Sequence, residues 1–113
     1  MDDADIEVTP EQTAAALADG SAQVIDVREA YEWEAGRSAG AVHIELQELA
    51  GQAQTLDRER PVIFVCRSGA RSLMAAQAFR RAGYDASSMA GGLLAWIQDG
   101  RALEPADGHV AQH

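Results

Sequence analysis

The feature that most constrains the fold is a short, wholly apolar run at residues 62–65, Val-Ile-Phe-Val, which ends at Cys66. A strand that is apolar on both faces is typical of the middle of a parallel sheet with helices on both sides. A loop containing Gly69 follows directly, and residues 72–82 have the small apolar composition of a helix that ends at Gly83. The run therefore predicts a strand, loop and helix unit with a thiol at the carboxyl end of the strand.

The rest of the chain repeats this alternation of short strands and helices. Thr9, Pro10 and Gln12 have the spacing of a helix start, with Thr9 as N-cap and Gln12 closing a capping box. Strands are expected at residues 6–8, 24–27, 41–44, 62–65 and 87–89, and helices at residues 10–19, 29–35, 45–53, 72–82 and 91–99. This pattern predicts a three-layer α/β/α fold, a mostly parallel five-stranded central sheet flanked by helices. Ligands bind beyond the carboxyl ends of the strands in such sheets.

The length of 113 residues fits a single domain, since domains usually contain about 50–250 residues. We divide the chain into a flexible acidic N-terminus at residues 1–5, a domain at residues 6–103 and a polar tail at residues 104–113. The tail is expected to be frayed, because it is polar and contains glycine and proline.

The charge of the chain narrows its partners. Acidic residues number 18 and basic residues 9, all arginine, so the formal net charge is −9. Such a surface disfavours nucleic acid and anionic membranes. A small anion can still bind locally, because exposed charges are screened beyond about 8 Å at physiological salt. The first residues lack the basic start and apolar stretch of a secretory signal, so we expect a cytoplasmic protein, and a monomer at this size.

Cys66 is the only cysteine, so it is either a buried packing residue or a working thiol. Backbone N–H groups of the loop and the N-terminus of the following helix both favour the thiolate over the thiol. Arg67 and Arg71 add full positive charges to the same loop. Two flanking arginines and a glycine favour the working thiol. The same cradle would bind a small anion that carries an electrophilic sulfur or phosphorus.

Four stretches of the chain resemble the single-domain rhodanese family of sulfurtransferases. They are Ile-Asp-Val-Arg-Glu at residues 25–29 with Tyr-Glu-Trp at 31–33, Gly-Ala-Val-His-Ile at 40–44, Cys-Arg-Ser-Gly-Ala-Arg-Ser at 66–72, and Ala-Gly-Gly-Leu at 90–93 with Trp96. The resemblance extends over residues 7–103 and implies a rhodanese-like fold. It also implies that the Cys66 thiolate takes sulfane sulfur from thiosulfate or a persulfide and passes it to cyanide, a thiol or a protein cysteine. No metal or organic cofactor is implied.

The resemblance also assigns site residues. Cys66 would be the nucleophile, and the loop that binds substrate and persulfide would consist of Arg67, Ser68, Gly69, Ala70, Arg71 and Ser72. Arg67 is expected to face the mouth of the site, and Arg71 to brace the loop or neutralise charge. Asp26 and Arg28 are expected to form an ion pair that supports the loop, because buried charges need partners.

Residues outside the loop receive simpler interpretations. His43 lies within an apolar run and is interpreted as a hydrogen-bonded strand residue and not as a catalyst. The acidic residues Glu29, Glu32 and Glu34 are expected to form a solvated face, with docking of a partner as the alternative.

Two alternatives remain open. One is a sulfur-carrier or interaction module with little turnover of free thiosulfate, which would share the same loop. The other is a phosphatase or arsenate reductase, whose related loop has five residues between cysteine and arginine. Cys66 and Arg71 are separated by four residues, and the shorter ring suits a sulfur atom on the thiolate. The stretch Gly-Arg-Ser-Ala-Gly-Ala at residues 36–41 also departs from the usual Gly-His-Ile-Pro-Gly-Ala, and Arg37 could add a positive group near the site.

Overall fold

A computed structural model describes residues 5–113 of the chain. The sheet has five strands, all parallel to their neighbours, in the order β1-β5-β4-β2-β3. The strands are β1 (Glu7–Val8), β2 (Gln23–Asp26), β3 (Val42–His43), β4 (Val62–Val65) and β5 (Ala86–Met89). The predicted α/β fold class is confirmed. The expected flexible N-terminus lies, apart from Asp5, outside the described residues.

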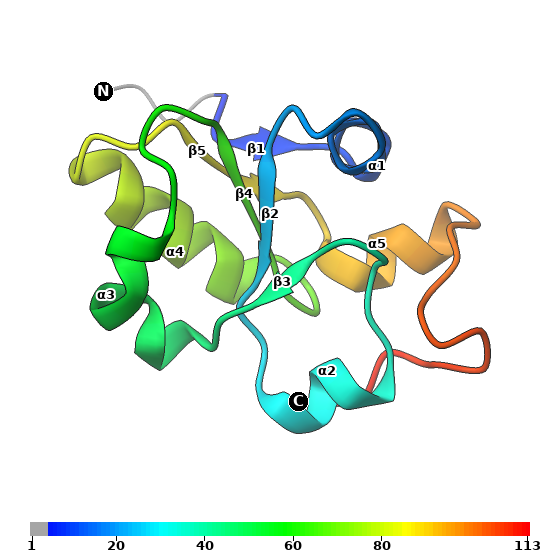
Figure 1. Ribbon diagram of the computed structural model, residues 1–113. Helices are drawn as coiled ribbons and strands as arrows, with labels where there is room; N and C mark the ends of the chain where they lie inside the picture. Colours follow the sequence, from blue (N-terminus) through cyan, green and yellow to red (C-terminus); the bar gives the residue numbers. More distant parts are fainter. Residues whose placement is uncertain (1–4) are drawn as a thin grey trace.

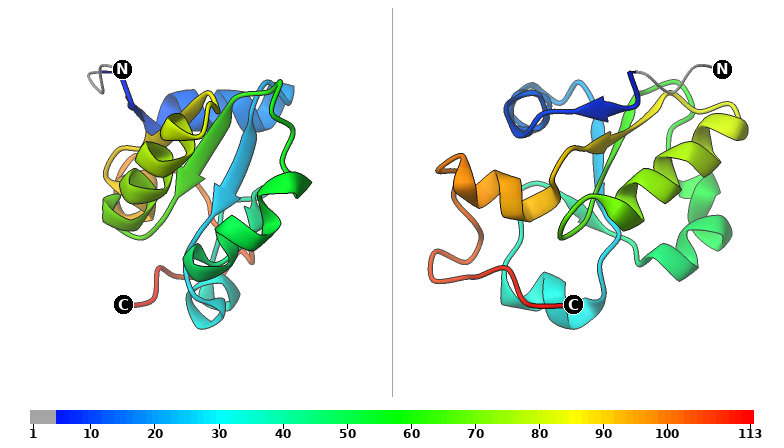
Figure 2. Two further views of the ribbon diagram at one scale, coloured as in Figure 1. Left: turned by 90° about the vertical axis from the view of Figure 1, so that its left-hand side faces the viewer. Right: turned by 180° about the vertical axis from the view of Figure 1, so that it is seen from behind.

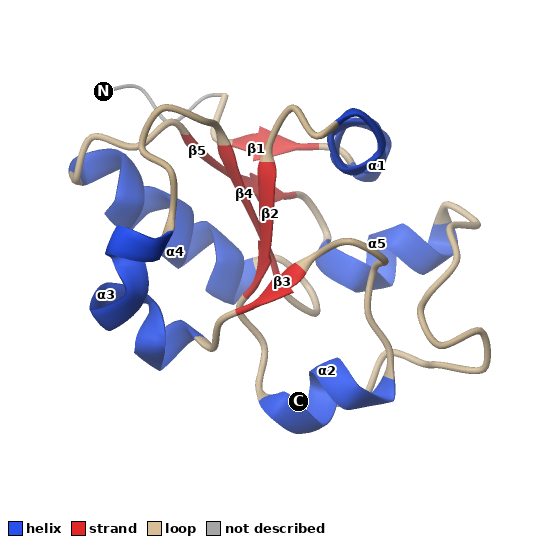
Figure 3. Ribbon diagram, in the orientation of Figure 1, coloured by secondary structure: helices blue, strands red, loops and turns tan. Residues whose placement is uncertain are grey.

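Helices cover both faces of the sheet, as Figures 1 and 2 show. One face carries α1 (Pro10–Asp19) and α5 (Gly92–Gln98), and the other carries α3 (Leu49–Gln52) and α4 (Ala70–Arg81). The remaining helix, α2 (Ala30–Ala35), lies beyond the carboxyl ends of the strands, close to the C-terminus (Figure 3). Among residues 5–113, no helix has the length and apolar character needed to cross a bilayer.

Residues close together in the sequence determine where most helices and strands begin and end. Thr9 and Gln12 form the predicted capping box, and α1 ends at Gly20 in the left-handed conformation. The helix expected over residues 45–53 is broken, with four α-helical residues between the 3₁₀ turns Leu46–Glu48 and Ala53–Thr55. An isolated helix of this length is marginal, and Gly51 in its interior weakens it further.

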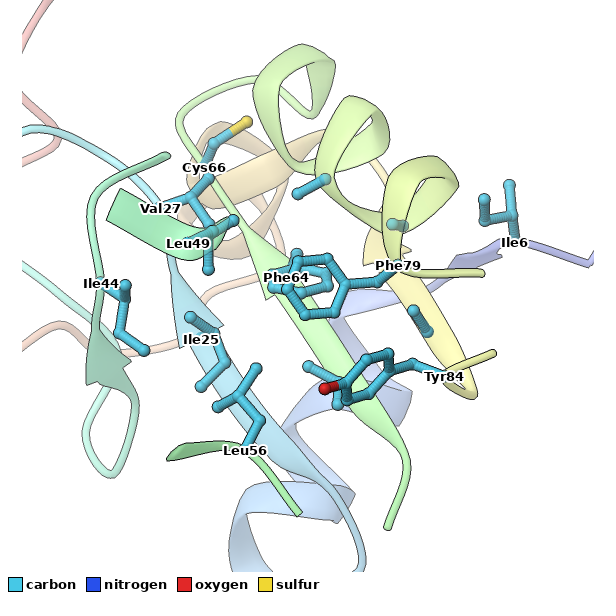
Figure 4. Packing of buried hydrophobic residues seen from close by; sticks show 14 residues of the cluster. Ile6, Ile25, Val27, Ile44, Leu49, Leu56, Phe64, Cys66, Phe79 and Tyr84 are labelled. Carbon is cyan, nitrogen blue, oxygen red and sulfur yellow. The ribbon is translucent and has the colours of Figure 1, made fainter. Parts of the chain in front are cut away.

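The two faces of β4 explain why its whole sequence is apolar. Val62 and Phe64 belong to the cluster packed under α3 and α4, and Ile63 and Val65 to the cluster packed under α1 and α5. In the first cluster the Phe79 ring lies 5.0 Å from that of Phe64 (centroid to centroid), in a tilted arrangement (Figure 4). Cys66 lies at the end of this cluster, so the packing of the core fixes the position of the thiol (Figure 4).

The C-terminal segment differs from the expectation of a frayed tail. Arg37 and Glu104 form an antiparallel bridge, and the His109 N–H donates to the carbonyl of Ala35 at the end of α2. Gly36 makes this approach possible, because a Cβ there would lie 2.6 Å from the carbonyl oxygen of His109. Near the end of the chain, the Tyr31 hydroxyl donates to the carbonyl of Gln112. The segment is therefore held against α2 by long-range backbone bonds that its polar composition does not reveal.

Candidate active site

The cysteine sulfur lies in a ring of hydrogen-bond donors at the junction of β4 and α4. Cys66 is 1% exposed, and its Sγ accepts the backbone N–H of Gly69 at 3.1 Å and that of Ser72 at 3.4 Å. The Ser72 hydroxyl lies 3.3 Å from the same sulfur. The N–H of Ser72 belongs to the first turn of α4, where the helix contributes partial positive charge. This arrangement is suited to a negative charge on the sulfur or on a group attached to it.

The loop is held from the far side by the start of α5. The N–H of Leu93 donates to the Cys66 carbonyl at 2.9 Å, and that of Leu94 donates to the Arg67 carbonyl at 3.0 Å. Gly92 makes this contact possible, because a Cβ at this position would lie 2.4 Å from the Arg67 carbonyl oxygen. Gly92 therefore permits close packing of α5 against the loop that carries the thiol, whereas a Cβ at Gly91 would meet Ala95 of α5 itself.

Arg71 braces the loop through a two-pronged ion pair with Glu32 of α2. Its Nη1 and Nη2 donate to the two carboxylate oxygens of Glu32 at 2.8 and 2.9 Å. The Glu32 side chain is fully buried, so the expectation that it belongs to a solvated face is wrong. Glu29 and Glu34 are exposed as expected. The error arose because the partner of Glu32 lies 39 positions away in the chain.

The ion pair shifts the titration of both partners. Burial raises the pKa of Glu32, but the hydrogen bonds from Arg71 and from the Glu29 backbone, with the charge of Arg71, hold that pKa below its usual range. The hydrogen bond to Glu32 raises the pKa of Arg71, against the effect of burial. The charge of Cys66 favours the protonated guanidinium as well. Arg71 is thus a fixed cation that is partly neutralised by Glu32.

Asp26 and Arg28 form the expected ion pair behind the loop. Both side chains are fully buried, and Arg28 Nη2 donates to Asp26 Oδ2 at 2.8 Å and to the Gly36 carbonyl at the end of α2, also at 2.8 Å. Between the two, the Val27 N–H donates to the Val65 carbonyl, one residue before Cys66. The pair thus lies between α2 and the end of β4.

The remaining predicted loop residues are more accessible than the cysteine. Ser68 and Ala70 are exposed, and Arg67 is partly exposed. Within residues 5–113, Arg67 forms no ion pair, so its charge is not neutralised by a carboxylate. Arg37 is engaged elsewhere, because its guanidinium lies 5.1 Å from the Trp33 ring centroid and donates to the Trp33 carbonyl.

His43 has the role expected of a strand residue. Its Nε2 lies 2.7 Å from the carbonyl oxygen of Arg28, and its ring stacks on Trp33 with the centroids 4.9 Å apart. These contacts hold α2 against β3 and confirm that His43 is a hydrogen-bonded residue of the strand.

One site residue was missed. Ser88 of β5 is fully buried, and its Oγ lies 2.7 Å from Ser72 Oγ, behind the sulfur. The sequence offered one indication of this role, which is a polar residue in a strand of an otherwise apolar parallel sheet. In the structure this residue pairs with Phe64 of β4.

Three possible metal-ligand atoms also come together beside α2. They belong to Glu29, Glu32 and His113 and lie within 4.8 Å of one another. Both carboxylate oxygens of Glu32 already accept hydrogen bonds from Arg71. The Glu32 carboxylate therefore serves the brace of the loop, and a cation here would compete with Arg71 for it.

A thiol at the carboxyl end of a parallel strand, ringed by backbone N–H groups at a helix N-terminus, has the geometry of a cysteine loop suited to an anion. The family model for the rhodanese-like domain matches residues 9–99. The chain belongs to the rhodanese-like family.

Relatives and solved structures agree with this assignment. The chain is 33% identical over 108 residues to the thiosulfate sulfurtransferase GlpE of Pseudomonas aeruginosa (strain LESB58), with 95% of this chain and 94% of GlpE covered. It is 38% identical over 66 residues to the putative sulfur carrier protein YrkF of Bacillus subtilis (strain 168), with 58% of this chain and 36% of YrkF covered. The crystal structure of a rhodanese-related protein from Thermoplasma volcanium matches with a TM-score of 0.78 at 25% identity, over 86% of this chain and 95% of that one. The family and the names of these relatives support a rhodanese-type sulfurtransferase or sulfur carrier.

Proposed function

We propose that the chain is a sulfurtransferase that moves sulfane sulfur from thiosulfate, or from a persulfide donor, through a persulfide on Cys66. The observation that carries the proposal is the set of donors on Cys66 Sγ, namely two backbone N–H groups and one hydroxyl. All three groups are placed to stabilise a thiolate as nucleophile and leaving group, and the two backbone N–H groups would also favour the anion of a bound persulfide.

The reaction would run in two steps. The Cys66 thiolate attacks the outer sulfur of thiosulfate, a new S–S bond forms, and sulfite leaves with the electron pair of the broken S–S bond. Cys66 then carries a persulfide whose negative charge is on the outer sulfur. In the second step cyanide or a thiolate attacks that outer sulfur, and Cys66 leaves as the thiolate. The resting enzyme is regenerated, so kinetics of the ping-pong type are expected.

The charged residues around Cys66 would have different roles in the reaction. Arg67 has no carboxylate partner within residues 5–113, so its charge is available to attract an anionic donor at the partly exposed mouth. Arg71 is held by Glu32 and would keep the loop in shape. The buried pair of Asp26 and Arg28 would support the end of β4 in the same way.

The proposal is tested with three substrates, namely thiosulfate, a protein persulfide and an aryl phosphate. We expect the wild-type protein to form thiocyanate from thiosulfate and cyanide, with parallel lines in double-reciprocal plots, and Cys66→Ser to form none. An aryl phosphate should not be hydrolysed, because the loop has only four residues between Cys66 and Arg71.

The other outcomes separate the alternatives. Transfer from a protein persulfide without turnover of thiosulfate would support the sulfur-carrier alternative. Hydrolysis of the aryl phosphate that depends on Cys66 would contradict sulfur transfer as the function of the loop.

A further inference from the structure

A row of two buried hydroxyl groups leads from the active-site sulfur into the sheet. Ser72 Oγ lies 3.3 Å from Cys66 Sγ, and Ser88 Oγ lies 2.7 Å from Ser72 Oγ. Both serines are fully buried. Ser88 belongs to β5 and pairs in register with Phe64 of β4, the strand that ends at Cys66. The second hydroxyl is therefore fixed by the sheet and does not contact the sulfur itself.

The direction of the hydrogen bonds follows from the number of hydrogens available. Each hydroxyl has a single hydrogen to donate. Within residues 5–113, Ser72 Oγ is the only hydrogen-bond partner of Ser88 Oγ. A buried hydroxyl that fails to donate is unfavourable, so Ser88 donates to Ser72. Ser72 in turn keeps its own hydrogen for another acceptor.

Two acceptors compete for the Ser72 hydrogen. One is the Gly69 carbonyl oxygen at 3.2 Å, and the other is Cys66 Sγ at 3.3 Å. A neutral thiol is a weak acceptor, so the carbonyl is preferred when the sulfur is protonated. A thiolate forms a stronger, charge-assisted hydrogen bond and draws the Ser72 hydrogen to itself. Donation from Ser88 polarises the Ser72 hydroxyl and strengthens that bond.

We propose that Ser88 is a positioning residue for sulfur transfer, which donates to Ser72 and thereby holds the Ser72 hydrogen on Cys66 Sγ whenever that sulfur is charged. The inference rests on the proposed function in one respect, which is that the charged sulfur is the nucleophile and leaving group of the reaction. The effect of Ser88 is specific to the free Cys66 thiolate. In the persulfide the charge has moved to the outer sulfur, so Ser72 can return its hydrogen to the Gly69 carbonyl.

The pH dependence of Cys66 alkylation tests this proposal without requiring sulfur transfer. The rate of iodoacetamide addition is measured by intact mass from pH 5 to 10 for wild type, Ser88→Ala and Ser87→Ala. We expect the midpoint for Ser88→Ala to lie higher by roughly half a pH unit, since the lost bond acts through a second one. Ser87 is its neighbour in β5 and faces the other side of the sheet, so the same change there should leave the midpoint where it is.

A second pair of variants separates action through Ser72 from a general loosening of the site. In a Ser72→Ala background, adding Ser88→Ala should shift the midpoint no further, because the intermediary is already gone. Equal midpoints for wild type and Ser88→Ala would overturn the proposal, and so would a full additional shift in the Ser72→Ala background. If the expected shifts occur but no donor loads sulfur onto Cys66, the proposed function fails while the row of hydroxyls stands.

Discussion

Replacing Arg71 with alanine is expected to lower the free energy of unfolding by about 3 kcal/mol and to slow sulfur transfer on the order of 100-fold. The variant leaves the Glu32 carboxylate, which is fully buried, without the guanidinium that binds both of its oxygens. A buried charge without a partner is costly, and the loop loses its link to α2 at the same time. Urea unfolding and thiocyanate formation measure the two effects separately.

Two further variants separate the effect on stability from the effect on the rate of sulfur transfer. The double variant Glu32→Gln with Arg71→Met removes both charges and should recover most of the stability, because no unpaired ion remains buried. Its transfer rate should stay low, since the brace is still missing. Arg67→Ala removes the other arginine of the loop, which forms no ion pair within residues 5–113, and should leave stability nearly unchanged. A stable, fully active Arg71→Ala protein would contradict a bracing role for Arg71.

The pH dependence of the free energy of unfolding provides an independent test of the ion pair between Arg71 and Glu32. The pKa of Glu32 in the folded protein lies below its ordinary value of 4.5, so the pair stabilises the fold above that pH. This contribution is lost as the pH falls through the lower, folded-state pKa. In Arg71→Ala we expect burial, the largest single influence on Glu32, to outweigh the remaining hydrogen bond from the Glu29 backbone and to raise the pKa of Glu32 instead. The stability gap between wild type and Arg71→Ala should therefore begin to narrow above pH 4.5, where the variant takes up a proton on Glu32. It should narrow further below pH 4.5, where wild type loses the contribution of the pair.

Gly92→Ala is expected to lower the free energy of unfolding by about 3 kcal/mol and to disturb the cysteine loop. The backbone at Gly92 has a φ of 59°, which is unfavourable for alanine. A Cβ would also lie 2.4 Å from the Arg67 carbonyl oxygen and 2.6 Å from that of Cys66. Neither backbone can move aside without shifting the loop. Urea unfolding and the alkylation rate of Cys66 at fixed pH provide the readouts.

Gly100→Ala is the matched control for this prediction. Gly100 has a similar φ of 77°, but a Cβ there would have no neighbour within 4 Å. Its replacement should cost about 1 kcal/mol from backbone strain alone and leave Cys66 alkylation unchanged. If the two variants lose the same stability and keep the same alkylation rate, the contact between α5 and the loop does not constrain the site.

Local chemistry accounts for the parts of the structure that were predictable. The strand at Val62–Val65, the loop after Cys66 and the capping box at Thr9 each depend on residues close together in the chain, and all three are confirmed. The parallel sheet followed from the alternation of strands and helices.

The remainder depends on contacts between distant segments. In the sequence Glu32 has the character of a surface residue, because its partner Arg71 belongs to another helix. Ser88 has the character of an ordinary strand residue, because its place behind the sulfur depends on the pairing of β5 with β4. The segment after Leu103 has a composition typical of a frayed end, yet backbone bonds to residues such as Ala35 hold it against α2. No local pattern encodes such pairings, because they follow from the topology of the whole chain.

The most direct test of the account is the intact mass of the protein after incubation with excess thiosulfate, for wild type and Cys66→Ser. A covalent persulfide predicts a gain of one sulfur, about 32 Da, on wild type alone. Addition of cyanide should then return the original mass and release thiocyanate. A mass gain on Cys66→Ser, or thiocyanate formation by wild type with no sulfur-loaded form at any time, would contradict transfer through Cys66.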